Sequence, residues 1–179
     1  MPQICPTVHT QNVSNNYKTY EMSRFLILAF TIFSFTFTIV DRNLVFDNEN
    51  LLNKKEETEL QRMIVDHESK TTNEIAIVTT PDWGEESSAL FFSVNFGNKH
   101  GIGKKGKDNG IVIVVSKQQR EARISTGYGT EEVLKDEIAK QIIDSLMIPR
   151  FKEGKYFQGI KDGTQEIIDF LEQPGNEIK

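Results

Sequence analysis

The stretch that decides the fold is residues 111–127, which read IVIVVSKQQREARISTG. Residues 111–116 are the most strongly apolar and β-branched segment of the chain that suits a strand, which predicts a buried one. Residues 117–120 form a polar turn and residues 121–127 return as a second strand, so the pair is expected to be an antiparallel hairpin. Because a strand buried on both faces needs helices on both sides, we expect a three-layer α/β/α sandwich.

Two further strands are expected before the hairpin. Residues 74–80, EIAIVTT, are short, apolar and β-branched, which predicts another buried strand. Residues 44–46 could add a short strand at the edge. The fold class is therefore α/β, with a small mixed sheet of three to four strands.

Helices are expected between the strands. The first begins at Asn53, whose side chain caps it with Glu56 as the reciprocal partner three residues on. Its apolar stripe ends at His67, which we expect to be a half-buried packing residue. A second helix covers residues 85–98, and its apolar and aromatic stripe is expected to face the core: Leu90, Phe91, Val94 and Phe96.

Two more helices are expected after the hairpin. The first follows a turn at residues 128–130 and ends at Pro149, which cannot continue it. The second has an inward apolar stripe of Phe157, Ile160, Ile167, Ile168 and Leu171.

The N-terminus carries a candidate export segment. Residues 25–40 are uncharged and follow Arg24, which is the layout of a signal peptide. A helix of this run would span only ~24 Å, less than the ~30 Å hydrocarbon core of a membrane. We therefore expect residues 22–42 to be a signal peptide and the protein to be exported, to the periplasm or another extracytoplasmic place. A membrane anchor through residues 25–40 is the alternative.

The remaining boundaries follow from this segment. Residues 1–21 are polar and precede Met22, so a start assigned too far upstream would explain them. Residues 43–174 are expected to form the single domain, and residues 175–179 a tail.

Charge and cysteine content limit the partners. The formal net charge of −5 argues against nucleic acid as the main partner, because phosphate neutralisation needs a basic face. Cys5 is the single cysteine, so the chain can form no internal disulfide and offers no cysteine pair for zinc. We expect a monomer.

Two glycine-containing loops carry the acidic residues of greatest interest. Residues 101–110, GIGKKGKDNG, lead into the hairpin, and residues 127–136 leave it. Ca²⁺ takes six to eight oxygens, from carboxylates and from backbone carbonyls, and these loops offer both kinds. The ordinary explanations are a turn at residues 108–110 and compensation of a helix dipole by Glu131 and Glu132. Composition alone favours the ordinary explanations.

Other site motifs fail on their context. Residues 101–106 match G-x-G-x-x-G, but they follow a helix and open a strand, which is the reverse of a dinucleotide-binding turn. The sequence has no G-x-S-x-G, no cysteine–histidine arrangement and no H-E-x-x-H. Nucleophilic catalysis therefore finds no support.

The region around the hairpin resembles the TPM domain family, and the likeness covers about residues 43–173. The turn at residues 108–110 with its apolar strand begins the pattern, and residues 149–160, PRFKEGKYFQGI, resemble the next block of the family. Between them the resemblance rests on Arg120, Arg123, Ile124, Gly127, Tyr128, Gly129, Glu131, Val133, Leu134 and Asp136.

The resemblance implies an α/β/α sandwich that binds divalent metal where two loops cross. The metal would be Ca²⁺, with Mg²⁺ as the alternative, as one ion or two. Glu132 departs from the family, which often has glycine there, and could add a further carboxylate. The implied ligands are Asp108, Asp136 and Glu131, then Asn109 and the carbonyls of Gly103 and Gly127.

Function in this family is diverse. It includes a thylakoid lumen member linked to photosystem II repair with acid phosphatase activity, a receptor-associated animal member and exported bacterial members. We expect a bacterial, stand-alone, exported domain with a non-catalytic, Ca²⁺-responsive role, and a protein partner at or near a membrane is compatible with it. The alternatives are a weak metal-dependent acid phosphatase, with Lys104, Lys105 or Lys107 holding the phosphate, and a pure interaction module.

Overall fold

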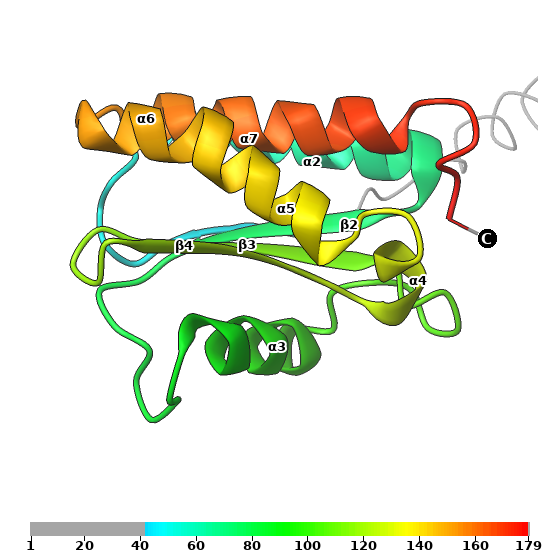
Figure 1. Cartoon of the computed structure of the whole chain (residues 1–179), viewed down its shortest axis with the longest axis horizontal. Helices are drawn as coiled ribbons and strands as arrows, with labels where there is room; N and C mark the ends of the chain where they lie inside the picture. The colour runs from blue at the N-terminus through cyan, green and yellow to red at the C-terminus, as the bar shows by residue number, and fades with distance from the viewer. Residues whose placement is uncertain (1–41, 179) are drawn as a thin grey trace, which may run out of the picture. The chain divides into compact units, whose positions relative to one another are not determined.

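The computed structural model describes residues 42–178, in which a four-stranded sheet lies between two helical layers (Figure 1). Helices α2, α5, α6 and α7 cover one face, and α3 covers the other. The strands are β1 (Val45–Asp47), β2 (Glu74–Thr79), β3 (Gly110–Ser116) and β4 (Glu121–Thr126), and their spatial order is their sequence order.

The sheet is mixed, as expected. β1 pairs with β2 and β2 with β3 in parallel, and β4 pairs with β3 as the antiparallel hairpin. The three-layer sandwich is thereby confirmed. The helices are α2 (Lys54–Thr71), α3 (Ala89–His100), α4 (Tyr128–Glu131), α5 (Asp136–Ile142), a π-helical turn η1 (Ile143–Met147), α6 (Ile148–Lys152) and α7 (Tyr156–Leu171).

The expectations about export and about residues 1–21 fall on residues outside the described part of the chain. Within residues 42–178, no helix is both long enough and apolar enough to cross a membrane.

The alternation of side chains along β2 and β3 sorts the core into two clusters. Successive residues of a strand point to opposite faces. We call the face of Ile75, Ile77, Ile111 and Ile113 the isoleucine face, and it packs against the large core with Leu60, Ile64, Ile160 and Ile167. The opposite, valine face presents Val78, Val112 and Val114 to α3 and its aromatic residues Phe92 and Phe96.

The start of α2 has the expected capping box. The side-chain oxygen of Asn53 accepts hydrogen bonds from the backbone N–H groups of Lys55 (3.0 Å) and Glu56 (3.1 Å), and the Glu56 carboxylate accepts one from the Asn53 N–H (2.8 Å). His67 is fully buried rather than half-buried, and its Nδ1 lies 3.0 Å from the Glu172 carboxylate.

The expected orientation of α3 is wrong for three of the four residues of its stripe. Leu90, Phe91 and Val94 are 40%, 55% and 44% exposed. The residues that face the sheet are instead the small ones at four-residue spacing, namely Ala89, Ser93 and Gly97. They let the helix approach so closely that a Cβ at Gly97 would lie 3.2 Å from Val112 Cγ2. Close approach to the sheet therefore decides the rotation of α3. Leu90, Phe91 and Val94 are turned to solvent, whereas Phe96 of the expected stripe packs with Phe92 against the valine face.

The expected helix from residue 131 to Pro149 is also wrong, at both of its ends. It is interrupted between α4 and α5, where Lys135 is extended and Asp136 becomes the first residue of α5 instead of lying one turn inside a helix. Pro149 lies within helical backbone, because the wider π-helical turn η1 precedes it. Proline has no N–H group and therefore removes one i→i−4 hydrogen bond from a regular α-helix. In a π-helical turn the hydrogen bonds run between residues five apart, so the regular α-helical pattern is already interrupted before Pro149.

A candidate metal-binding cleft

The two glycine loops cross through their backbones. The Gly127 N–H donates to the Gly110 carbonyl (2.8 Å), and the Gly129 N–H donates to the Asp108 carbonyl (3.1 Å). A Cβ at Gly127 would lie 2.2 Å from the Asp108 carbonyl oxygen, and a Cβ at Gly129 would lie 2.0 Å from that of Lys107. No side chain fits into either contact, so glycine is required at both positions for the loops to meet.

A cleft of about 470 Å³ opens beside this crossing, against α3 and β4. It brings together Asp108 from the first loop, Glu131 from α4 and Asp136 from the start of α5. Asp108 has a φ of 48°, a left-handed conformation that aspartate tolerates better than most residues. The other lining residues include Leu90, Ser93, Val94, Ile102, Val112, Arg123, Ser125, Gly127 and Tyr128.

The three carboxylates of this cleft suit a hard cation in their chemistry. Within residues 42–178, no hydrogen bond or ion pair engages the side chain of Asp108, Glu131 or Asp136. However, among the described residues no three acidic, histidine or cysteine side chains lie close enough together to hold one ion. A bound Ca²⁺ would thus rely on backbone carbonyls and water for much of its coordination.

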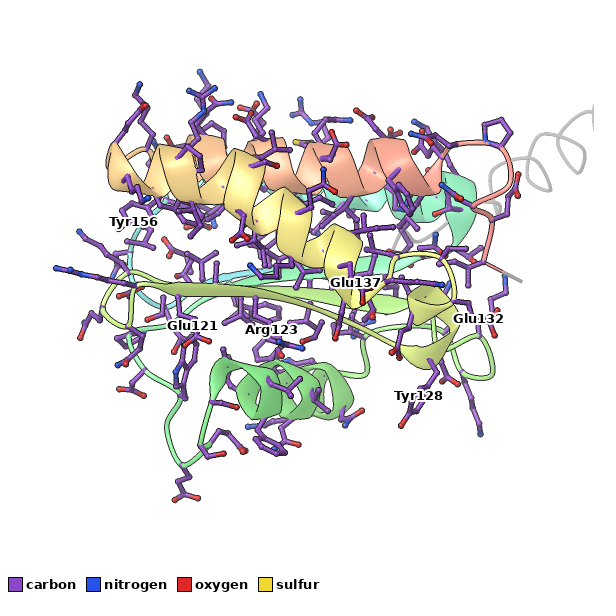
Figure 2. The ribbon with its side chains drawn as sticks, in the orientation of Figure 1. Glu121, Arg123, Tyr128, Glu132, Glu137 and Tyr156 are labelled. Carbon is purple, nitrogen blue, oxygen red and sulfur yellow. The ribbon has the colours of Figure 1, made fainter. Side chains whose placement is uncertain are left out.

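The other expected ligands lie differently. The Asn109 side chain is fully buried: its Oδ1 accepts from the Lys104 N–H (2.8 Å), and its Nδ2 donates to the Thr72 carbonyl and the Asn73 side chain (3.0 Å each). Gly103 packs against the Gly110 backbone with a φ of 103°. Glu132 is exposed beside α4 and does not line the cleft (Figure 2). Of the expected ligands, the cleft therefore brings together Asp108, Gly127, Glu131 and Asp136. Asn109, Gly103 and Glu132 lie outside it.

An ion-pair network behind the crossing holds the first loop. The buried Glu74 carboxylate accepts from Lys104 Nζ (2.5 Å), from the Gly103 N–H (2.7 Å) and from Arg42 (3.0 Å). Burial alone raises the pKa of Glu74, but the hydrogen bonds from Lys104 and Gly103 and the charges of Lys104 and Arg42 outweigh it, and the net pKa lies below its ordinary value. Glu74 is therefore held as a carboxylate.

Two of the three lysines suggested as phosphate-binding residues, Lys104 and Lys107, are engaged in other contacts. Lys104 bonds to Glu68 (2.6 Å) as well as to Glu74, and these hydrogen bonds raise its pKa. Lys107 Nζ donates to Thr72 Oγ1 (3.1 Å). Both point toward the end of α2, and neither lines the cleft.

Arg123 is a cleft residue that the sequence analysis did not identify as part of the site. It projects from β4 between the sheet and α3 (Figure 2). Its Nε donates to Ser125 Oγ (3.1 Å), and Ser125 in turn lies 2.6 Å from the buried Ser93 hydroxyl. The alternation of Glu121, Arg123 and Ser125 on one face of an edge strand was the available signal.

The open side of the cleft is apolar. Leu90 and Val94 of α3 form one border, and Tyr128, which is 83% exposed, projects from α4 on another. The cleft therefore combines three carboxylates, one guanidinium group and an apolar rim.

Comparison with known proteins supplies the context for this geometry. The family model described as the TPM domain matches residues 45–170. No curated protein matches the chain. The solution structure of the N-terminal domain of a protein from P. gingivalis is similar, with a TM-score of 0.67 and 29% identity over 76% of this chain and 87% of that one.

Two further solved structures share the fold. The BA42 protein from the psychrophilic bacterium Bizionia argentinensis has a TM-score of 0.59 and 22% identity, over 69% of this chain and 83% of that one. The N-terminal domain of the cg2496 protein from Corynebacterium glutamicum has a TM-score of 0.57 and 11% identity, over 72% and 79%.

Proposed function

Because this chain belongs to the TPM domain family, we propose that its crossed loops bind a divalent cation, Ca²⁺ in preference to Mg²⁺. The main support is that Asp108, Glu131 and Asp136 line one cleft and have no protein partner within the described residues. Ca²⁺ tolerates irregular oxygen shells completed by carbonyls and water, whereas Mg²⁺ demands a near-ideal octahedron. A cleft with few carboxylates within reach of one ion therefore suits Ca²⁺ better.

The proposed role is regulatory rather than catalytic. The three carboxylates that line this cleft carry like charges, and a bound cation would offset their mutual repulsion. Metal would therefore favour one arrangement of the two loops and of the apolar rim beside them, and this change of arrangement is the proposed regulatory signal. Export, and a protein partner at or near a membrane, remain predictions.

The experiment is thermal unfolding with and without metal. A ligand that binds only the folded state stabilises it by RT ln(1 + L/Kd), where L is the free metal concentration, which is ~2.7 kcal/mol at a hundredfold excess over Kd. For a domain of this size the melting temperature should rise by roughly 5 °C in Ca²⁺ relative to EDTA. Mg²⁺ should give a smaller rise.

Matched variants make this experiment specific. The paired substitution Asp108→Asn and Asp136→Asn keeps size and hydrogen bonding but removes charge, so it should abolish the metal-dependent rise. The control pair Asp144→Asn and Asp169→Asn removes the same charge from exposed helical sites and should keep the rise. If the unsubstituted protein melts identically in Ca²⁺ and EDTA, the metal proposal is wrong.

A weak metal-dependent acid phosphatase is the second candidate, and Arg123 is the observation that favours it. A guanidinium group in the same cleft as the carboxylates is suited to an oxyanion held near a cation. Hydrolysis of a generic phosphomonoester that survives repurification and is lost in both Asp108→Asn and Arg123→Gln would favour this function. Activity that is unchanged in Arg123→Gln would remove the reason for it.

A further inference from the structure

A second cleft lies at the other end of the sheet, where β3 ends. It has a volume of about 560 Å³ and separates the turn between β3 and β4 from the corner between α6 and α7. Figure 2 shows Tyr156 and Glu121 at this end, away from α4. The lining residues are Ser116, Lys117, Arg120, Glu121, Ile148, Phe151, Lys152 and Tyr156.

The charge of this cleft is opposite to that of the chain. Lys117, Arg120 and Lys152 border it against a single acid, Glu121, although the chain carries a net charge of −5. In the part of the chain that the structure describes, no carboxylate forms an ion pair with any of these three cations. The Lys117 ammonium group lies over the Tyr156 ring, with Nζ 5.7 Å from the ring centroid. Three cations are thus available to an anion.

The opposite wall is apolar and fixed. The rings of Phe151 and Tyr156 are stacked, with centroids 5.2 Å apart and planes 17° from parallel. Gly159 of α7 makes room for the Phe151 ring, because a Cβ there would lie 2.5 Å from Phe151 Cε1. Phe151 and Tyr156 therefore give the cleft a packed aromatic wall.

The basic turn is also held in place. The Glu49 carboxylate accepts hydrogen bonds from the backbone N–H groups of Lys117 (2.8 Å) and Gln118 (3.0 Å), and the Gln119 N–H donates to Ser116 Oγ (3.1 Å). Pre-formed walls lower the ordering cost of binding.

We propose that this cleft binds an oxyanion that is joined to an apolar group, the oxyanion at Lys117, Arg120 and Lys152 and the apolar group against Phe151 and Tyr156. An aromatic or hydrophobic phosphate ester has this chemistry, and so does the headgroup region of an anionic lipid. The proposal is independent of the metal site, because the cleft lies at the opposite end of the sheet and three of its four charged lining residues are cations.

The first test is an NMR titration of the ¹⁵N-labelled protein in EDTA with phenylphosphonate, which cannot be hydrolysed like an ester. Saturable shifts should appear in residues 116–121 and 148–157 and not in residues 101–110 or 127–136. Inorganic phosphate and benzyl alcohol each supply half of the ligand, so each should bind at least tenfold more weakly. A phenylphosphonate titration without saturable shifts in these segments up to about 10 mM, the range of the weakest specific binding, overturns the proposal.

Charge variants separate the cleft from the general charge of the protein. The triple variant Lys117→Gln, Arg120→Gln and Lys152→Gln should weaken phenylphosphonate binding at least tenfold. The control triple Lys70→Gln, Lys99→Gln and Lys135→Gln removes equal charge at the ends of α2 and α3 and before α5, and should bind as the unsubstituted protein does. Equal loss in both triples contradicts the proposal.

Vesicles identify the source of the oxyanion. Co-sedimentation with phosphatidylglycerol vesicles but not phosphatidylcholine vesicles, lost in the cleft triple only, assigns the site to a lipid headgroup. Phenylphosphonate binding without co-sedimentation assigns it to a soluble organic anion.

Discussion

The isoleucine face and the valine face of the sheet are made by the same two strands, yet they are covered very differently. Helices from three parts of the chain cover the isoleucine face, whereas α3 is the one helix on the valine face (Figure 1). It approaches that face through small residues, with Phe92 and Phe96 packed beside them. Leu90, Phe91 and Val94, which are exposed, belong to the valine side, and the candidate metal cleft opens there. The well-covered face holds the fold together, and the thinly covered face leaves room for a site.

The largest effect should come from truncating the two faces in adjacent residues of β3. Ile113→Ala should cost about 2–5 kcal/mol of unfolding free energy, because the site is fully buried and surrounded by several helices. Val114→Ala should cost less than Ile113→Ala. It removes fewer carbon groups, each worth about 0.8 kcal/mol before any cavity cost, and α3 can move into the space left by the side chain. Urea unfolding measures both. Equal costs would show that one helix packs the sheet as tightly as several do.

An intermediate effect is expected from Glu74→Gln, at the end of the valine face where charge replaces apolar packing. Leaving Lys104 and Arg42 with a weaker partner should cost about 1–3 kcal/mol at neutral pH. Because the pKa of Glu74 is lowered in the folded state, its stabilisation is complete above the unfolded value of about 4.3 and is lost as pH falls through the folded value. The difference in unfolding free energy between the unsubstituted protein and Glu74→Gln should therefore become smaller only below about pH 4.5. A difference that stays constant down to pH 3 contradicts the carboxylate assignment.

The smallest effect should come from Phe91→Ser, on the solvent side of α3. Its side chain is more than half exposed, so the unfolding free energy should change by about 0.5 kcal/mol or less. The matched change at the inner position, Phe92→Ser, removes a ring that packs against Trp83 and Phe96, and should cost clearly more. Similar costs at both positions would mean that α3 is rotated from the orientation described here.

Sequence reasoning succeeded where one physical effect dominates. The apolar, β-branched run from Ile111 onward and the capping box at Asn53 are local and strong signals, and both are confirmed. The rotation of α3 was missed because it depends on how closely a helix can approach a sheet, through Ser93 and Gly97, and not on which residues are largest. Pro149 was misjudged because a π-helical turn, whose hydrogen bonds span one residue more than those of an α-helix, leaves no clear mark in the sequence.

The candidate site could be predicted from the sequence only in part. The family resemblance implied that the two loops cross, and Asp108, Glu131 and Asp136 do line one cleft beside the crossing. The buried hydrogen bonds of Asn109 join it to Thr72 and Asn73, which are distant in sequence, so they could not be predicted. The position of Arg123 in the cleft depends in the same way on the packing of α3 beside β4. Metal binding itself stays a prediction.

The strand order has a consequence for chirality. β1, β2 and β3 are parallel and lie side by side in that order, yet α2 packs on one face and α3 on the other. Two crossovers that advance in the same direction over opposite faces must have opposite hands, so one of them is left-handed. Strand twist favours the right-handed form in nearly all such connections. This chain therefore needs side-chain packing to impose the rarer hand at one of its two parallel crossovers.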